Sequence, residues 1–216
     1  MEAIPRTVDT ADWITIVLFA SVLFLVLTKS FYYSRFLNYI ILPFNNKYIF
    51  IYSKKDMLFN WFNVLFTFFQ LLNCSLFIYL AWNTLGSSGD GYDPKMFLVI
   101  VGAVILFLSG KIFLQLGNGF IFNANRIITE FIFKKLSYFN YSGLVMFLAN
   151  VTLAYIFRES ATVVYVALGF ILFINGMGLA LLIRNHQNFI TANFFYFILY
   201  LCALEIAPLV IIGSYL

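Results

Sequence analysis

Long runs of apolar residues, almost free of charge, dominate this chain. Six such runs lie near 13–29, 58–82, 96–117, 142–158, 162–184 and 193–215. A helix needs about 20 mostly apolar residues to cross the hydrocarbon core of a bilayer. The whole chain has 216 residues, of which 63% are hydrophobic and only 10% are charged. Because a soluble globule of this size cannot enclose so much apolar surface, the runs predict membrane spans.

The continuity of the runs decides between the two architectures that can cross a bilayer. A transmembrane β-barrel alternates apolar and polar residues over segments of about ten residues. These runs are instead unbroken Phe, Leu, Ile and Val. We therefore expect an all-α fold, a polytopic transmembrane helical bundle of six spans formed as one domain by residues 1–216. The fourth span is the weakest of the six, because it is short, contains Asn150 and ends at Arg158.

Lysine and arginine are concentrated in alternate loops. Nine of them follow the first, third and fifth predicted spans, and three lie in the N-terminal tail and in the loops after the second and fourth spans. Because basic residues in short loops stay on the cytoplasmic side during insertion, both termini are predicted to face outward, into the periplasm of a bacterium. The same bias explains the net charge of +4. The expected partners are therefore the lipid bilayer and other inner-membrane subunits, and not nucleic acid.

Two cytoplasmic segments, 31–55 and 126–139, have the composition of interfacial segments. The first mixes Tyr and Phe with Arg and Lys around a turn at Pro43. In the second, helical spacing places Ile128 and Phe131 toward one side and Glu130 and Lys134 toward the other. Both segments are predicted to lie in the headgroup zone. They serve either as an anchoring belt or as a docking surface for a partner.

Two ionisable residues lie at depth in predicted spans, where a charge costs about 2.5–3.5 kcal/mol. Glu205 lies near the midplane in the sixth span, and Lys111 lies several ångströms closer to the cytoplasm in the third. Because helix side chains tilt toward their own N-terminus, these two side chains lean toward each other and can pair. The alternative for Lys111 is that its ammonium group extends to the cytoplasmic surface.

Pro208 adds a second feature to the sixth span. A proline cannot donate to the carbonyl four residues earlier, which here is that of Leu204. The freed carbonyl lies beside Glu205, so together they could bind a cation, a proton-bearing water or a donor from a neighbour. The alternative is a structural kink in which Glu205 fixes helix packing.

Uncharged polar residues occur at similar depth in three other spans. They are Gln70 and Asn73 in the second, Asn150 in the fourth and Asn175 in the fifth. In the second span, a set of residues recurs at helical spacing and predicts one polar stripe, namely Asn63, Thr67, Gln70 and Cys74. We expect this stripe to face protein and to join helices through hydrogen bonds. A substrate route lined by these residues is the alternative.

The sequence contains no recognisable catalytic motif. Its only histidine, His186, follows the fifth span, and no aspartate lies within a predicted span. A hydrolase triad, a haem site and a zinc site therefore lack the necessary side chains at depth. The chain is predicted not to be an enzyme and to hold no cofactor and no metal.

The last span carries a resemblance to a known family. Its residues Tyr200, Leu201, Cys202, Leu204, Glu205 and Pro208 follow an aromatic stretch. In this pattern the segment resembles the closing segment of an uncharacterised family of multi-pass inner-membrane proteins of Bacteroidota, a domain of unknown function. The residues Tyr52-Ser53-Lys54-Lys55 before the second span are similar too. The resemblance implies a location and an architecture but no activity.

These observations support two functional hypotheses. The first is a non-enzymatic accessory or assembly subunit of a larger inner-membrane complex, with protein-export or secretion machinery as the expected assembly. The second is a small proton- or cation-linked transporter or channel that uses Glu205, with Gln70, Asn73, Asn150 and Asn175 along the route.

Overall fold

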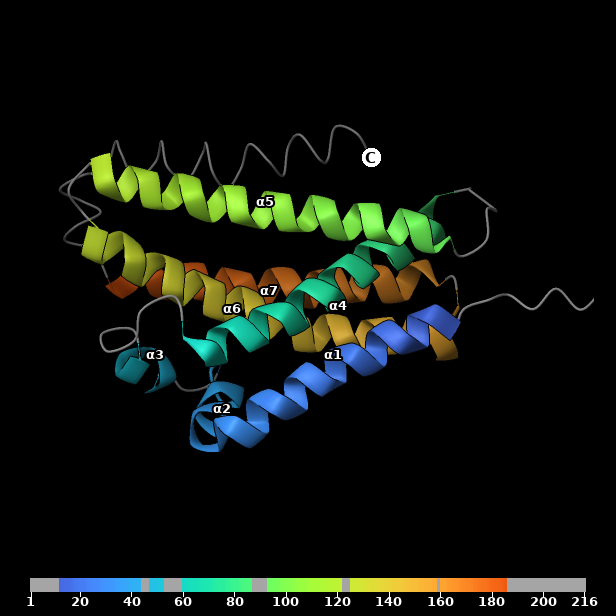
Figure 1. The fold of residues 1–216 in the computed structure, drawn as a ribbon, viewed down its shortest axis with the longest axis horizontal. Coiled ribbons are helices and arrows are strands. Elements are labelled where there is room, and N and C mark those ends of the chain that lie inside the picture. Colours follow the sequence, from blue (N-terminus) through green and yellow to red (C-terminus); the bar gives the residue numbers. More distant parts are fainter. Residues whose placement is uncertain are drawn as a thin grey trace, which may run out of the picture.

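The structure, a computed structural model, describes residues 12–43, 47–52, 60–86, 93–121, 125–158 and 160–185, and the secondary structure in these ranges is helical (Figure 1). Five helices are long and apolar enough to cross a membrane. They are α1 (Asp12–Phe31), α4 (Trp61–Leu85), α5 (Pro94–Ile121), α6 (Asn125–Val151) and α7 (Ala161–Asn185). The predicted all-α membrane fold is thus confirmed for this part of the chain. The predicted sixth span, 193–215, lies outside the described residues.

The fourth span differs from the predicted one. Helix α6 begins at Asn125 and continues into a π-helical turn, η1 (Thr152–Ile156), so the predicted interfacial segment 126–139 is the first half of the same helix. The charges that suggested an interface are partly neutralised, because Lys134 Nζ lies 2.8 Å from Glu130 Oε1 one turn away. The predicted division into two faces also fails, since Phe131 and Lys134 are both buried.

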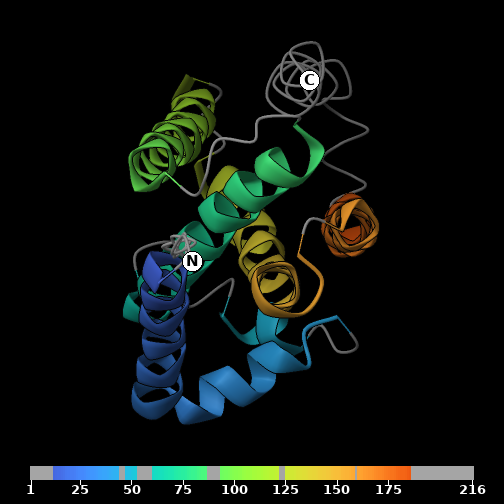
Figure 2. The ribbon, with the colours of Figure 1, turned by 90° about the vertical axis from the view of Figure 1, so that its right-hand side faces the viewer.

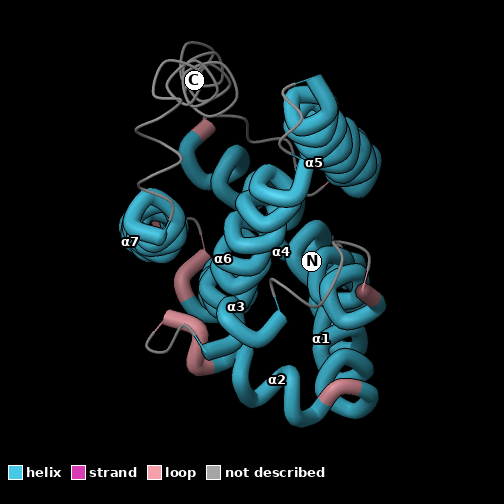
Figure 3. The backbone as a smooth tube through the Cα atoms, turned by 90° about the vertical axis from the view of Figure 1, so that its left-hand side faces the viewer, coloured by secondary structure: helices cyan, strands magenta, loops and turns pink. Residues whose placement is uncertain are grey.

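The helices surround a central pair formed by α4 and α6. Helix α1 packs on α4, α7 packs on α6, and α5 packs on both central helices. End-on views show α1, α5 and α7 as separate helices around this pair, with α7 on the side away from α1 and α5 (Figures 2 and 3). The central helices therefore have protein on most of their surface, whereas α5 and α7 are largely exposed.

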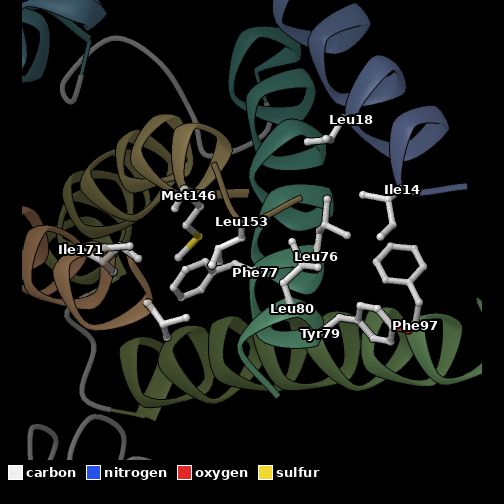
Figure 4. Close-up of a cluster of buried hydrophobic side chains, with 13 residues drawn as sticks. Ile14, Leu18, Leu76, Phe77, Tyr79, Leu80, Phe97, Met146, Leu153 and Ile171 are labelled. Atoms are coloured by element: carbon white, nitrogen blue, oxygen red, sulfur yellow. The ribbon is translucent and has the colours of Figure 1, made fainter. Parts of the chain in front are cut away.

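Two apolar clusters fill the interior. The first joins α1, α4, α5, α6 and α7 through Ile14, Leu18, Leu76, Phe77, Leu80, Phe97, Met146, Leu153 and Ile171 (Figure 4). At its edge the Trp13 ring lies 5.2 Å from that of Tyr79 and 5.0 Å from that of Phe97, measured between centroids. Aromatic contacts of this kind add to the area buried. They hold the start of α1 against α4 and α5.

The second cluster includes side chains of the aromatic segment 31–55. This segment forms two short helices, α2 (Tyr33–Ile40) and α3 (Lys47–Tyr52). Its rings do not all face a bilayer, because Tyr39 and Tyr48 are almost completely buried against α4 and α6. Tyr33 and Leu37 remain exposed on the other side of α2. The segment therefore closes one end of the bundle with its buried aromatic residues and exposes a smaller number of rings outward.

Candidate functional site

A row of polar side chains runs along the contact between α4 and α6. On α4 it contains Asn63, Gln70 and Asn73, which are buried, together with the half-buried Thr67. Their spacing of three or four residues puts them on one side of the helix, and that side faces α6. Buried Asn140 and Asn150 contribute from α6. The predicted stripe therefore faces protein, as polar groups at membrane depth should.

Hydrogen bonds join the two helices at two levels of this row. Asn150 Nδ2 donates to the backbone carbonyl of Asn73 over 2.9 Å. Asn140 Nδ2 donates to Thr67 Oγ1 over 3.0 Å, and the Thr67 hydroxyl donates to the carbonyl of Asn63 over 2.7 Å. A bond of this type contributes about 0.6 kcal/mol on average between transmembrane helices. The row thus fixes the register of α6 on α4.

Gln70 fills a notch between these two levels. Its side chain lies against Gly143 of α6, where an added Cβ would collide with Gln70 Oε1. Gln70 Nε2 donates to Met146 Sδ over 3.6 Å. The glycine thus makes room for a completely buried amide.

Several side-chain oxygens of the row can each accept a further hydrogen bond. Within the described residues, the side-chain oxygens of Gln70, Asn73, Asn140 and Asn150 are buried and have no hydrogen-bond partner. Amide oxygens can accept from water or coordinate a hard cation. Amides and hydroxyls do not ionise near neutral pH, so the row by itself offers coordination but not acid–base chemistry.

The row continues into a buried arginine at the end of the bundle. Tyr48 Oη donates to Asn63 Oδ1 over 3.3 Å, and Arg35 Nη2 donates to Tyr48 Oη over 3.4 Å. The Arg35 guanidinium lies 4.4 Å from the ring centroid of Tyr52 and 4.8 Å from that of Phe62. Cation–π contacts of this kind offset the cost of burying the charge. Arg35 thereby fastens α2 and α3 to α4.

Tyr39 makes a second connection at the same end. Its hydroxyl donates to the carbonyl of Ser137 over 2.6 Å, and Tyr141 Oη donates to the carbonyl of Ile40 over 3.2 Å. Burial raises the pKa of Tyr39 well above its ordinary value, and the neighbouring Tyr48 and Tyr141 raise this pKa further. The neutral phenol is therefore the form that the fold requires.

Lys111 lies apart from the polar row. It projects from α5 toward α6, where its side chain lies close to that of Lys135. Lys111 Nζ also lies 5.9 Å from the ring centroid of Phe107. Its predicted partner Glu205, and Pro208 beside it, lie outside the described residues.

The predicted site residues thus fall into separate groups. Gln70, Asn73 and Asn150 share the row, whereas half-buried Asn175 only donates to the carbonyl of Ile171 in its own helix over 2.8 Å. Lys111 belongs to the lysine pair between α5 and α6. No three His, Cys, Asp or Glu side chains within the described ranges are grouped closely enough to hold a metal ion.

Three functional side chains were missed from the sequence. Arg35 and Lys135 were read only as charges of cytoplasmic loops, and Asn140 lies just before the predicted fourth span. The surrounding sequence does indicate the environment of Arg35, because Tyr and Phe recur throughout 31–55. For Lys135 the indication is weaker. The sequence reveals the salt-bridge partner of Lys134 through helical spacing, but Lys111, which lies beside Lys135, belongs to another helix, α5.

Comparison with known proteins gives one match. The sequence pattern of a family described as a domain of unknown function, DUF4271, matches residues 14–216. This range includes all five long helices apart from the first residues of α1. No curated protein and no solved structure matches the chain.

Proposed function

The chain belongs to the DUF4271 family, and we propose that it is a non-enzymatic integral subunit of a larger complex in the inner membrane of Bacteroidota. Protein-export or secretion machinery is the proposed assembly, and both termini are proposed to lie on the periplasmic side. The observation that carries the proposal is the outward face of α5, which has the shape of a helix-binding surface.

This face alternates large and small residues at heptad spacing. The large residues Val99, Leu106 and Phe113 are 71%, 74% and 76% exposed. Each is followed four residues later by a small residue, in turn Ala103, Gly110 and Gly117, and nothing comes within 4 Å of the Cβ position at either glycine. Small residues let transmembrane helices approach closely, and a seven-residue repeat keeps one face in contact with a partner helix. A face that meets only lipid has no need of this pattern.

The interior supports the same function. Its amides are engaged in joining α4 to α6, as the bond from Asn150 to the Asn73 carbonyl illustrates. Arg35 and Tyr39 in turn attach α2 and α3 to this central pair. A bundle held together in this way is suited to present a fixed outer surface to a neighbouring subunit.

Purification of the tagged chain from native membranes in gentle detergent tests the proposal. We expect a partner protein to co-purify with the wild type and with Gly169→Ile, because Gly169 of α7 also has open space around it. Gly110→Ile, which fills the face of α5, should lose that partner. A free monomer in every sample, or equal recovery with both variants, would refute the proposal. Mass spectrometry identifies the partner. A partner unrelated to export or secretion would reject the proposed assembly.

A second candidate is a small proton- or cation-linked transporter or channel that uses Glu205. The buried oxygens of Gln70, Asn73 and Asn150 without hydrogen-bond partners among the described residues favour it. Vesicles reconstituted with the protein should then show ion flux that Glu205→Gln abolishes. Asn38→Ala is the control, because this amide lies outside the proposed route and donates to the Ser34 carbonyl of its own helix. Flux that is absent, or unchanged by Glu205→Gln, would exclude this candidate.

A further inference from the structure

Two tryptophans mark the level at which α4 meets the membrane surfaces. Trp61 and Trp82 lie near the two ends of α4 and are 71% and 46% exposed. Trp82 follows Trp61 by 21 positions, which is about 32 Å along a helix. This length matches the thickness of a hydrocarbon core, about 30 Å. Because tryptophan is enriched at both interfaces of a bilayer, the pair places the Trp61 end of α4 at one membrane surface.

Helix α2 lies close to this level. The ring of Tyr32, which precedes α2, lies 6.1 Å from that of Phe62, measured between centroids. The Tyr39 ring lies 5.6 Å from that of Phe62 and 4.6 Å from that of Phe66. Phe66 follows Trp61 by five positions, which is about 8 Å along α4. Helix α2 therefore lies within the depth of about 5–10 Å to which interfacial helices insert.

Helix α2 also has the direction of an interfacial helix. Helix α1 ends at Phe31, and Tyr32 turns the chain with φ −131° and ψ 47°. The other end of α2 is fixed to α6, because the Tyr39 hydroxyl donates to the Ser137 carbonyl. In Figure 1 α2 is seen nearly end-on beside the long helices, and in Figure 2, turned by 90°, it is seen lengthwise. It thus runs along the membrane surface that Trp61 marks.

The surface of α2 divides into three sides. One side is buried against the bundle, and the exposed remainder consists of an apolar strip and a polar edge. At 100° per residue, the apolar strip covers about 100° of the helix circumference and the polar edge lies beside it. The buried side contains Arg35, Phe36 and Tyr39, the apolar strip contains Tyr33, Leu37, Ile40 and the adjoining Ile41, and the polar edge contains Ser34 and Asn38.

The surroundings of the apolar strip favour lipid as its partner. The strip continues the outer surface of α1, where Phe19 and Val26 are 69% and 54% exposed and Phe31, directly before α2, is 71% exposed. Exposed Lys29 in the last turn of α1 is long enough to extend to headgroups. The four side chains of the strip are far fewer than the roughly 20–30 residues that each partner contributes to a stable protein interface.

We infer that α2 is an interfacial helix whose apolar strip inserts into the membrane leaflet at the Trp61 end of the bundle. The strip contacts acyl chains just below the headgroups, and the polar edge faces the headgroups. This contact involves one side of one short helix, because Tyr39 and Tyr48 of the same aromatic segment pack on protein. It does not involve the face of α5 on which the proposed function rests, so the failure of either idea leaves the other intact.

Spin labelling of the full chain in phospholipid vesicles tests the position of α2. In a chain whose Cys74 and Cys202 are replaced by Ser, Leu37→Cys reports on the apolar strip. Ser34→Cys, on the polar edge of the same helix, is the matched control. Oxygen concentrates in hydrocarbon, whereas a nickel chelate stays in water. The ratio of label collisions with oxygen to those with the chelate should be several-fold higher at residue 37 than at residue 34.

Two results of this measurement would overturn the inference. An equal ratio at residues 34 and 37 would place the apolar strip in water. Low access of both reagents to residue 37 would show that the strip is covered by protein.

Photo-cross-linking extends the test to native membranes. A benzophenone side chain replaces Leu37 or, as the control, Ser34, and mass spectrometry identifies what becomes attached on irradiation. Phospholipid adducts should be several-fold more abundant at residue 37 than at residue 34. A protein adduct at residue 37, or no excess of phospholipid there, would overturn the inference.

Discussion

A close approach of α7 to α6 allows a sharp test of the packing. At Gly178, an added Cβ would lie 2.6 Å from Cγ and 2.8 Å from Cβ of Tyr138 on α6. Ordinary van der Waals contact begins at 3.4 Å. Tyr138 Cβ is attached to the backbone and cannot rotate away. A methyl group at Gly178 therefore has to push the two helices apart.

The expected cost follows from two opposing terms. Overpacking of a closely packed contact costs about 1–3 kcal/mol. Alanine favours a helix over glycine by about 1 kcal/mol, which offsets part of that cost. We therefore expect Gly178→Ala to destabilise the protein by about 1 kcal/mol, and Gly178→Leu to destabilise it by several times more. In a chain of this size, 1 kcal/mol lowers Tm by roughly 2–4 °C.

The control is Gly176 on the same helix, where nothing lies within 4 Å of the Cβ position. Gly176→Ala should leave Tm unchanged or raise it, because only the helix-propensity term acts. The measurement is thermal unfolding of the purified variants in detergent, followed by circular dichroism at 222 nm. If Gly178→Ala is as stable as Gly176→Ala, the described contact between α6 and α7 is wrong.

Other substitutions test the remaining contacts. Asn150→Ala removes the bond to α4 and should cost about 0.6–1.7 kcal/mol of unfolding free energy, more than Asn175→Ala, whose bond lies within one helix; equal losses in chemical denaturation would contradict this. Arg35→Met should lose about 1–2 kcal/mol of cation–π stabilisation and speed proteolysis of α2 and α3, whereas Arg35→Lys should be intermediate. Because the pKa of Tyr39 is raised in the folded state, its neutral phenol stabilises the fold below pH 10, and this contribution is lost as the pH rises further. Tyr39→Phe should therefore reduce the decrease in Tm at alkaline pH. An unchanged dependence of Tm on pH would contradict this role of Tyr39. A C-terminal alkaline phosphatase fusion should be active, as it is only when it lies in the periplasm, and an inactive fusion would reverse the proposed orientation.

The long helices were predictable from the sequence because hydropathy alone determines them. Unbroken apolar runs of about 20 residues can only be satisfied as helices in a bilayer. The spans that became α1, α4, α5 and α7 therefore follow from hydropathy alone. The inward direction of the polar stripe through Asn63 and Gln70 was predictable for a related reason, since a stripe that faces lipid leaves its amides unsatisfied.

Features that depend on contacts between distant segments were not predictable. The charges of 126–139 suggested an interfacial segment, yet Glu130 and Lys134 neutralise each other and the helix continues. The rings of 31–55 suggested the headgroup zone, and sequence alone cannot distinguish an aromatic ring that faces lipid from one that packs on protein. Tyr48 packs on protein because Asn63 and Arg35 lie within hydrogen-bonding distance. The pairing of Lys111 with Lys135 arises in the same way, from the packing of α5 on α6.

The widened turn at Thr152–Ile156 has a consequence for the opposite rim of the bundle. Phe157 N donates to the carbonyl of Thr152 over 2.8 Å, five residues earlier, where a regular α-helix bonds four residues earlier. The Tyr155 hydroxyl within this turn shares a hydrogen bond of 2.7 Å with Thr15 Oγ1, near the start of α1. Deleting one residue here restores regular winding and rotates the following side chains by about 100°. The additional residue in this turn thus keeps Tyr155 directed toward Thr15, and its deletion would break this contact between the first span and the fourth.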